Sequence, residues 1–532
     1  MVADTPKSVG AVGVRPFRFW RRLVLTAIAV AWAATSFWGA TKTLPPGTRV
    51  DSPWSVVPIA NVSFIPDVTS ADAYGRPVVS QGIFDQVLKV VRSARHFIVL
   101  DYFLFNDQGT AGTATPVRAI SGELRDALIE QRRLYPDIRI LLVTDPINEV
   151  YGSVPSRDLI LLRAAGVDVA ITNLNALRDS NPLYSGLWRL GISWWNGKGT
   201  GEGWLPNPLD ESDAPVTFGS WAKLLNFKAN HRKVIVADDG HDGVVGVVGS
   251  ANPHDASSAH SNIAAKVAGP ALLSLMRSEM DIARFSGWKG AIPLPDEGAP
   301  PTTQAATPPG IRTAPASVAG SVALGDVDVA AGRAARVKVI TEGVILDELR
   351  EKIAAAGKGD SIDIAMFYLS SRVIVESLLD ASSRGAVVRL ILDPNKDAFG
   401  HEKSGIPNRP VASELVSASD GGIHVRWYRT HGEQFHTKLV MIYGSQRLWM
   451  TLGSANLTRR NLGDYNLEAN LAIEVSRNSP LADQALEYFE NLWSNRAGIG
   501  IEYTTDFAAY ADPAQTRYWL YRLMEGTGLS TF

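Results

Sequence analysis

Apolar residues recur along the chain in two alternating patterns, one with the period of a helix and one typical of a buried strand. Residues 82–95 carry apolar side chains at positions 83, 87, 90 and 91, on one side of a predicted helix. A strand is predicted over residues 96–105, a helix over 121–134 and a further strand over 138–143. This alternation predicts an α/β fold with a mixed or parallel sheet.

The same order returns in the second half of the chain. A helix, a strand, a second helix and a second strand are predicted over residues 346–355, 361–368, 373–385 and 387–392. Each repeat also has an Asp-Pro turn, and helices over residues 271–285 and 481–493 correspond. We therefore expect two similar lobes, each a mixed sheet flanked by helices. Their expected bounds are residues 46–290 and 334–532, with a Pro/Ala-rich linker over 291–333.

A longer apolar stretch precedes both lobes. Residues 23–40 would span about 27 Å as a helix, close to a hydrocarbon core of roughly 30 Å. Arginines just ahead of this stretch favour an N-terminus left in the cytoplasm and a body on the extracytoplasmic, periplasmic side. We expect residues 1–45 to be a cytoplasmic segment and membrane anchor. A cleaved signal peptide, which would give a secreted body, is the alternative.

The composition is that of a globular protein, with 45% hydrophobic residues, 20% charged residues and a net charge of −2. This balance does not suggest a surface for polyanions, so no nucleic-acid partner is expected. Cysteine is absent, which excludes disulfides and thiolate metal sites. Nothing in the pattern indicates an oligomeric state.

A His-x-Lys motif occurs once in each lobe. His231 and Lys233 lie in one apolar run, and His436 and Lys438 lie in another. On a strand, a spacing of two residues directs both side chains to the same face. A lone histidine in such a run is usually a core residue, but a duplicated pair predicts catalysis.

Each motif is followed, at a nearly equal distance, by Gly-Ser-Ala-Asn. The first copy contains Ser250 and Asn252, and the second contains Ser454 and Asn456. These residues are common in turns, but their matched position makes them candidates for donating hydrogen bonds to a phosphate. Two histidines, two lysines and two asparagines supply the nucleophile, the acid and the cations that phosphodiester cleavage needs, without a metal or cofactor.

This pair of motifs resembles the signature of the phospholipase D superfamily, H-x-K-x4-D followed by G-S-x-N. The resemblance implies two lobes that share one active site and a covalent phosphohistidine, with His231 as the nucleophile and His436 as the acid and base. The sequence around His231 is similar to the first motif of bacterial cardiolipin synthases and related membrane-associated phospholipases D. The implied function is phospholipase D or phosphatidyltransferase chemistry on phospholipids, with water or an alcohol as acceptor.

Two positions depart from the family pattern. The aspartate of H-x-K-x4-D is Asp238 in the first copy but Tyr443 in the second, and its odd spacing from the histidine predicts a structural role. In the family, a glutamate of N-x-E orients a histidine, and Glu468 supplies it in the second repeat. The corresponding stretch of the first repeat ends in Ala264, which weakens the assignment of the nucleophile; Asp255 is a candidate replacement.

The first lobe carries an insertion over about residues 173–226, which is rich in tryptophan. It contains Trp188, Trp194, Trp195, Trp204 and Trp221. Tryptophan favours lipid–water interfaces, so the insertion is either a lid or docking surface for an amphipathic substrate, or it packs on the lobe.

Two alternative functions remain open at this point. A nuclease-type phosphodiesterase would use the same pocket and would present a basic groove. A lipid-binding protein without turnover would explain the departures at Tyr443 and Ala264.

Overall fold

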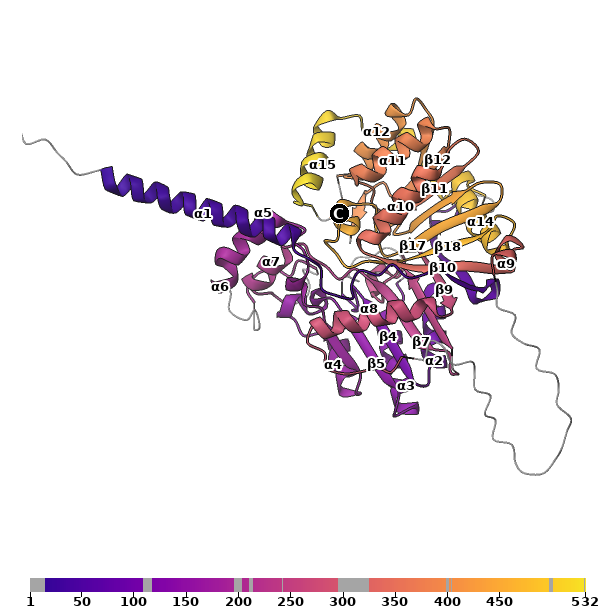
Figure 1. Cartoon of the computed structure of the whole chain (residues 1–532), viewed down its shortest axis with the longest axis horizontal. Helices are drawn as coiled ribbons and strands as arrows, with labels where there is room; N and C mark the ends of the chain where they lie inside the picture. Colours follow the sequence, from indigo (N-terminus) through magenta and orange to yellow (C-terminus); the bar gives the residue numbers. More distant parts are fainter. Residues whose placement is uncertain are drawn as a thin grey trace, which may run out of the picture.

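Two β-sheets lie side by side in the computed structural model, each with helices packed against it, and one long helix projects from the body (Figure 1). The structure describes residues 15–108, 117–195, 203–209, 214–241, 243–294, 325–398, 401–402, 404–496, 501–530 and 532. The architecture confirms the expected α/β class with two similar lobes.

The sheet of the first lobe has the strand order β3-β2-β9-β8-β7-β4-β5-β6. Strands β4, β5 and β6 are parallel, and the other neighbours are antiparallel. The strands are β2 (Val62–Ala71), β3 (Pro77–Ser80), β4 (Phe97–Tyr102), β5 (Arg139–Thr144), β6 (Asp168–Ile171), β7 (Lys233–Asp238), β8 (Val244–Gly249) and β9 (Asn262–Ala268).

The second sheet has the order β1-β10-β18-β17-β16-β11-β12-β15-β19, and its centre repeats the arrangement of the first. Its strands are β1 (Ser55–Pro58), β10 (Ala334–Thr341), β11 (Ser361–Met366), β12 (Val387–Leu392), β15 (Ile423–Tyr428), β16 (Lys438–Tyr443), β17 (Arg447–Gly453), β18 (Ala469–Ser476) and β19 (Thr504–Asp506). A short hairpin of β13 (Asp397–Ala398) and β14 (His401–Glu402) stands apart from it.

Amphipathic helices cover the sheets. In α2, for example, the buried positions recur with the helical period, including Phe84, Val87, Leu88 and Val91. The helices of the first lobe are α2 (Ile83–Ser93), α3 (Ile120–Leu134), α4 (Arg157–Ala164) and α8 (Ala271–Phe285). Those of the second are α9 (Asp326–Ala330), α10 (Gly343–Ala355), α11 (Arg372–Ser383), α12 (Asn408–Ala418), α13 (Arg459–Leu462), α14 (Pro480–Ser494) and α15 (Gln515–Thr527).

Two segments differ from the expected division of the chain. Strand β1 was expected within the first lobe, but it pairs with β10 in the second sheet. The segment before β2 thus crosses the second lobe, where β10 offers it an unpaired edge. The expected linker lies mostly outside the described residues, and its last part forms α9, which packs on β10 and β18.

One hydrophobic core runs through both lobes. It includes Val234 and Ile263 of the first lobe together with Leu439 and Leu471 of the second. Helix α8 of the first lobe contacts β10, and α14 of the second contacts β2, so one long helix of each lobe also touches the other lobe. The two lobes are therefore packed into one body.

The projecting helix is α1 (Arg15–Thr41), and its C-terminal part packs on the tryptophan-rich insertion (Figure 1). Residues Arg18–Thr41 are long and apolar enough to cross a membrane, with a mean hydropathy of 1.6. The insertion contains η3 (Leu174–Ala176), α5 (Pro182–Leu187), the π-helix η4 (Trp188–Ile192), α6 (Ser193–Trp195) and α7 (Phe218–Leu224).

Candidate active site

The two His-x-Lys motifs lie at equivalent places, just before and at the start of β7 and β16. The residues just before each of these strands form backbone hydrogen bonds with the opposite lobe. The His231 N–H donates to the Leu467 carbonyl at 2.9 Å, and the Ser261 N–H donates to the Gln434 carbonyl at 3.0 Å. These cross-lobe bonds fix both motifs against one interface.

His231 and His436 line the same pocket, a cavity of about 360 Å³ between the lobes. Asn252 and Asn456, the last residues of the two Gly-Ser-Ala-Asn motifs, line it as well. The structure thus brings the predicted histidines and asparagines together, although they come from four separate segments.

Glu468 holds the imidazole of His231. Its carboxylate lies 3.0 Å from His231 Nδ1 and is fully buried. It also accepts hydrogen bonds from Ser454 and Asn461. The sequence pattern suggested that Glu468 supports His436 within its own repeat, and this is wrong, because the carboxylate crosses the interface to the histidine of the other lobe.

Asn262 plays the equivalent part for His436. Its Oδ1 lies 3.0 Å from His436 Nδ1. The strand register places Gly249 opposite Ala264 and Gly453 opposite Asn470, so Asn262 occupies the position of Glu468. The expected equivalence with Ala264 was wrong because this position lies ten residues after Asn252 in the first lobe but twelve residues after Asn456 in the second.

Asp255 does not replace a missing carboxylate at this site. It accepts a hydrogen bond from the Ser121 N–H at 2.9 Å, at the start of α3. Each histidine therefore has one acceptor from the opposite lobe, a carboxylate for His231 and an amide oxygen for His436.

The two serines of the motifs lie behind these acceptors. Ser250 Oγ donates to Asn262 Oδ1 at 2.9 Å, and Ser454 Oγ donates to Glu468. Both serines are fully buried. The structure gives them contacts that position the acceptors, and a direct contact with substrate stays a prediction.

The two lysines have matching surroundings. Lys233 Nζ donates to the His231 carbonyl at 2.6 Å, and Lys438 Nζ donates to the His436 carbonyl at 3.0 Å. Each ammonium lies 5.3 Å from the centre of an aromatic ring, Phe103 or Phe367. An ammonium has three N–H groups, so donors remain on both lysines for an anion.

Burial shifts the pKa of each of these groups. It lowers the pKa of His231 to about 4, although the Glu468 carboxylate acts in the opposite direction. Burial, followed by the charge of Lys438, lowers the pKa of His436 well below its usual value. Burial also lowers the pKa of Lys233 to about 7 and that of Lys438 well below its usual range.

His260 is a pocket residue that the sequence did not single out. It lines the pocket beside His436, with ring centres 6.0 Å apart, and its Nε2 has no hydrogen-bond partner among the described residues. By the strand register it is equivalent to Asn466, whose Oδ1 also lacks a described partner. A correct alignment of β9 with β18 would have found both positions.

The C-terminal segment also reaches the pocket. Phe532 is buried there, with its ring 6.2 Å from that of Tyr368. Arg460 donates to the Ser530 carbonyl just before it. The chain end lies near the middle of the molecule in Figure 1, which agrees with this placement.

The departure at Tyr443 lies away from the pocket. Asp238, at the far end of β7, accepts hydrogen bonds from the backbone N–H groups of residues 95–97. Tyr443, at the equivalent end of β16, donates to Asp363 at 2.9 Å. Both residues hold strand ends, as the odd spacing predicts. Among the described residues, no group of three or more acidic or histidine side chains forms a metal site.

The tryptophans of the insertion divide between the two expected roles. Trp221 Nε1 donates to the Pro206 carbonyl at 3.0 Å, so this side chain packs within the insertion. Trp194 and Trp204 are 85% and 76% exposed, which is unusual for such large apolar side chains. The side chain of Trp195 lies outside the described residues.

Comparisons with known proteins agree with this architecture. Residues 349–493 match the family model described as "Cardiolipin synthase, PLD-like domain". The search of curated proteins gave no match.

Among solved structures, the phosphatidylserine synthase of Haemophilus influenzae Rd KW20 is similar. It has a TM-score of 0.50 and 10% identity, over 94% of this chain and 99% of that one. Polyphosphate kinase from Porphyromonas gingivalis has a TM-score of 0.43 and 11% identity, over 88% of this chain and 53% of that one. The phospholipase D family member Nuc from Salmonella typhimurium has a TM-score of 0.23 and 20% identity, over 30% of this chain and 95% of that one.

The two repeated lobes around one shared pocket define a phospholipase D-like fold. The whole-length likeness to the synthase supports that fold, and the family match in the second lobe supports it in sequence. Residues 349–493 thus match a phospholipase D-like domain in sequence, and the two lobes together have the phospholipase D-like fold.

Proposed function

We propose that this protein hydrolyses or transfers phosphatidyl groups of membrane phospholipids through a covalent phosphohistidine. One observation carries the proposal: two imidazoles share one buried pocket, and each is held at Nδ1 by an acceptor from the opposite lobe. With Nδ1–H directed at the acceptor, Nε2 of each ring is free to act on a substrate.

His231 is the proposed nucleophile. Its depressed pKa keeps Nε2 unprotonated at neutral pH, and the buried Glu468 carboxylate stabilises the positive charge that develops on the ring as Nε2 attacks phosphorus. The bond from phosphorus to the leaving oxygen then breaks. The structural pairing with Glu468 supports this assignment over the reverse one.

His436 is the proposed acid and base. Its neutral acceptor, Asn262, does not fix a charge on the ring, so the imidazole can change protonation during the cycle. A bound phosphodiester adds negative charge beside His436 and favours its protonated form. This form donates a proton to the leaving alcohol, and the neutral form then removes one from water or an acceptor alcohol. The oxygen of that water or alcohol attacks phosphorus, and the bond from phosphorus to His231 Nε2 breaks.

Lys233 and Lys438 are the proposed phosphate ligands, with donors from Asn252 and Asn456. Two buried ammonium groups, each next to an aromatic ring of the pocket wall, would stabilise the charge on the phosphoryl oxygens, which is the task a metal would otherwise perform. We therefore propose that the reaction needs no metal ion or cofactor.

The family description and α1 together support a phospholipid as the substrate. The arginines ahead of the apolar stretch support a body on the extracytoplasmic side of the membrane. The head group and the acceptor are questions for the experiment below.

The test is turnover of mixed phospholipid vesicles by the full chain with EDTA present, with products resolved by mass spectrometry. We expect phosphatidic acid or a new phosphatidyl ester, absent in His231→Ala and His436→Ala. His424→Ala, which changes an exposed histidine of β15, is the matched control and should keep full activity.

Loss of turnover on adding EDTA would contradict metal independence. Turnover of DNA but of no lipid would favour the nuclease alternative, and lipid binding without any turnover would favour a binding protein. A phosphatidyl adduct trapped on a peptide other than the one with His231 would overturn the choice of nucleophile.

A further inference from the structure

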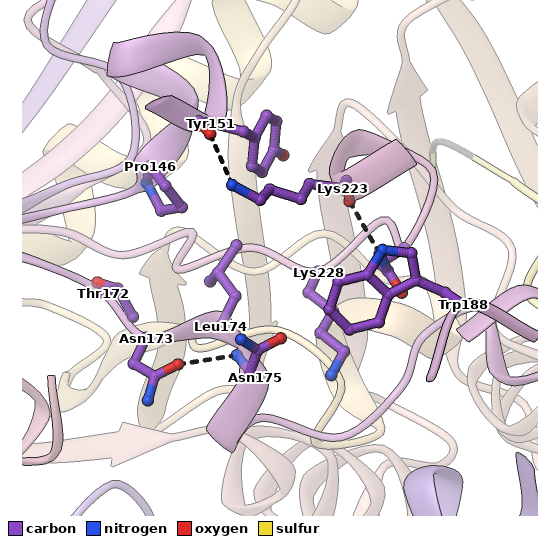
Figure 2. Close-up of a pocket in the computed structure, with 10 residues that line it drawn as sticks. Pro146, Tyr151, Thr172, Asn173, Leu174, Asn175, Trp188, Lys223 and Lys228 are labelled. Carbon is purple, nitrogen blue, oxygen red and sulfur yellow. Dashed lines mark hydrogen bonds between the residues drawn. The ribbon is translucent and has the colours of Figure 1, made fainter. Parts of the chain in front are cut away.

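A second cavity lies within the first lobe, between the tryptophan-rich insertion and the loop after β5. We call it the insertion pocket. It holds about 190 Å³, which is far more than one water molecule needs and leaves room for a phosphate group. Figure 2 shows Lys223 reaching towards Tyr151, with the ring of Trp188 on one side and Lys228 near Asn175.

Lys223 is the unpaired cation of this pocket. Its Nζ donates to the Tyr151 carbonyl at 3.0 Å, and among the described residues it has no acidic partner. The side chain is half-buried, and burial lowers the pKa of its ammonium group. A cation in this position gains from an anion that enters the cavity.

The charges around the pocket add up to an excess of cations. Asp179 is fully buried and pairs with Lys228 at 2.7 Å and with Arg189 at 2.6 Å. Lys42 donates to the carbonyl of Asn175 in the pocket wall at 2.6 Å. Three cations thus lie around this carboxylate, and Lys223 adds a fourth cation in the pocket wall.

The pocket also holds a hydrogen-bond donor without a partner in the described part of the chain. Trp188 Nε1 is buried and has no hydrogen-bond partner among the described residues. A buried donor left unpaired destabilises the protein, so a ligand oxygen that accepts from it is stabilised. An indole N–H and an unpaired ammonium that line the same cavity suit an oxyanion.

The position of the pocket points to a lipid. Lys42, bonded to the pocket wall, is the first residue after the apolar helix α1. Residues directly after a spanning helix lie at the level of the lipid phosphates. The catalytic pocket is lined by other residues of the described chain, so a ligand here is not the lipid under attack.

We propose that the insertion pocket binds the phosphate of a second, anionic phospholipid through Lys223 Nζ and Trp188 Nε1. The proposal goes beyond the proposed reaction and rests on the membrane setting of α1, not on catalysis. A lipid held there would lie in the same lobe as His231, near the loop in which Asp145 accepts from the Asn230 N–H at 2.8 Å.

The test is calorimetric titration of the full chain in neutral detergent with short-chain phosphatidylglycerol. The chain carries His436→Ala so that no lipid is consumed. We expect binding at two sites, one of which weakens at least about tenfold in Lys223→Gln and is kept in Lys223→Arg. Lys89→Gln, which changes an exposed lysine of α2, is the matched control and should keep both sites.

Equal binding by the Lys223→Gln and Lys89→Gln chains would overturn the proposal. Equal affinity of this site for inorganic phosphate would assign it to free phosphate, and equal affinity for short-chain phosphatidylcholine would show that it does not select anionic lipids. If Lys223→Gln does not fold, Trp188→Phe, which removes only the N–H donor, must weaken the same site, and unchanged binding there would overturn the proposal. Because nothing is turned over, this result is independent of the proposed reaction.

Discussion

At the scale of single residues, the two catalytic candidates differ in one contact. His231 faces a buried carboxylate, and His436 faces an amide oxygen at the same position of the other lobe. A carboxylate stabilises a charged imidazolium much more than a neutral imidazole. An amide oxygen stabilises the neutral ring nearly as well as the charged one. This single difference makes two similar lobes chemically unequal.

Replacing the carboxylate tests this inequality. Glu468→Gln keeps an acceptor but removes the charge, so we expect kcat to fall by about 100-fold or more, with little change in KM. Steady-state kinetics on vesicles, with the pH profile of kcat, measures the effect. Asn262→Asp is the complementary variant and should shift the pH profile, because a carboxylate then raises the pKa of His436.

If Glu468→Gln retained the wild-type kcat and pH profile, the carboxylate would not act on the reacting imidazole. Far-UV circular dichroism of the variant provides the control for folding, because Glu468 is fully buried and also accepts from two side chains.

The pH dependence of kcat/KM reports the ionisation of the essential groups in the free enzyme. Lys233, with a pKa lowered by burial to about 7, is charged below that pH and loses its proton above it. We therefore expect kcat/KM to fall as the pH rises through about 7. On the acid side, His231 has a pKa lowered by burial to about 4 and stays neutral, so its protonation should reduce kcat/KM only near that pH.

A soluble short-chain lipid assayed between pH 4 and pH 9 measures this profile. Lys233→Arg, which keeps its charge, should lose the alkaline fall at whatever activity it retains. An acid limb with a midpoint near 6.5, the ordinary value for histidine, would contradict the neutral state that we assign to His231.

At the scale of elements, the segment that enters strand β7 also joins the two lobes. Arg232, between His231 and Lys233, points away from the pocket and is fully buried. It donates to Glu279 of α8 at 2.9 Å and to Glu342, just before α10 in the second lobe, at 2.7 Å. The three residues from His231 to Lys233 thus hold the candidate catalytic groups on one side and the contact between the lobes on the other.

Removing this arginine should destabilise the fold. Arg232→Leu leaves two buried carboxylates without a cationic partner, so we expect the free energy of unfolding to fall by about 3–5 kcal/mol. Urea denaturation followed by circular dichroism measures it. Adding Glu279→Gln and Glu342→Gln should recover part of the loss, whereas Arg133→Ala, in an exposed pair with Glu130, should change little.

At the scale of the whole molecule, α1 and the insertion form one unit. Trp32 Nε1 donates to the Leu183 carbonyl at 2.8 Å, and Arg189 donates to the Thr35 carbonyl at 2.6 Å. These contacts lie several residues inside the end of the apolar helix. A membrane that contains α1 therefore also surrounds α5 and the start of η4. Leu187, the last residue of α5, is exposed there.

Site-directed spin labels can measure this depth, because the chain has no cysteine of its own. A label at Leu187→Cys, in the full chain reconstituted in vesicles, should be more accessible to oxygen than to a water-soluble nickel complex. Val327→Cys, on α9 at the end of the molecule opposite α1 in Figure 1, is an exposed apolar control and should give the reverse. An aqueous signal at Leu187 would show that the insertion lies outside the bilayer.

Much of the fold was predictable from the chain. Helix α8 and strand β12 have the predicted bounds, and the two His-x-Lys motifs begin matched strands. Local periodicity sets these features, because a strand directs alternate side chains to opposite faces whatever it packs against. The roles of the histidines, lysines and asparagines stay predictions until the kinetic tests above.

The partners of the histidines could not be predicted in this way. The sequence alone determined that each lobe would present a histidine and a lysine on one face of a strand. Only the tertiary structure decided that Glu468 serves His231 and Asn262 serves His436. The physical reason is that each acceptor reaches its histidine across the interface, through cross-lobe strand contacts that leave no local pattern in either repeat.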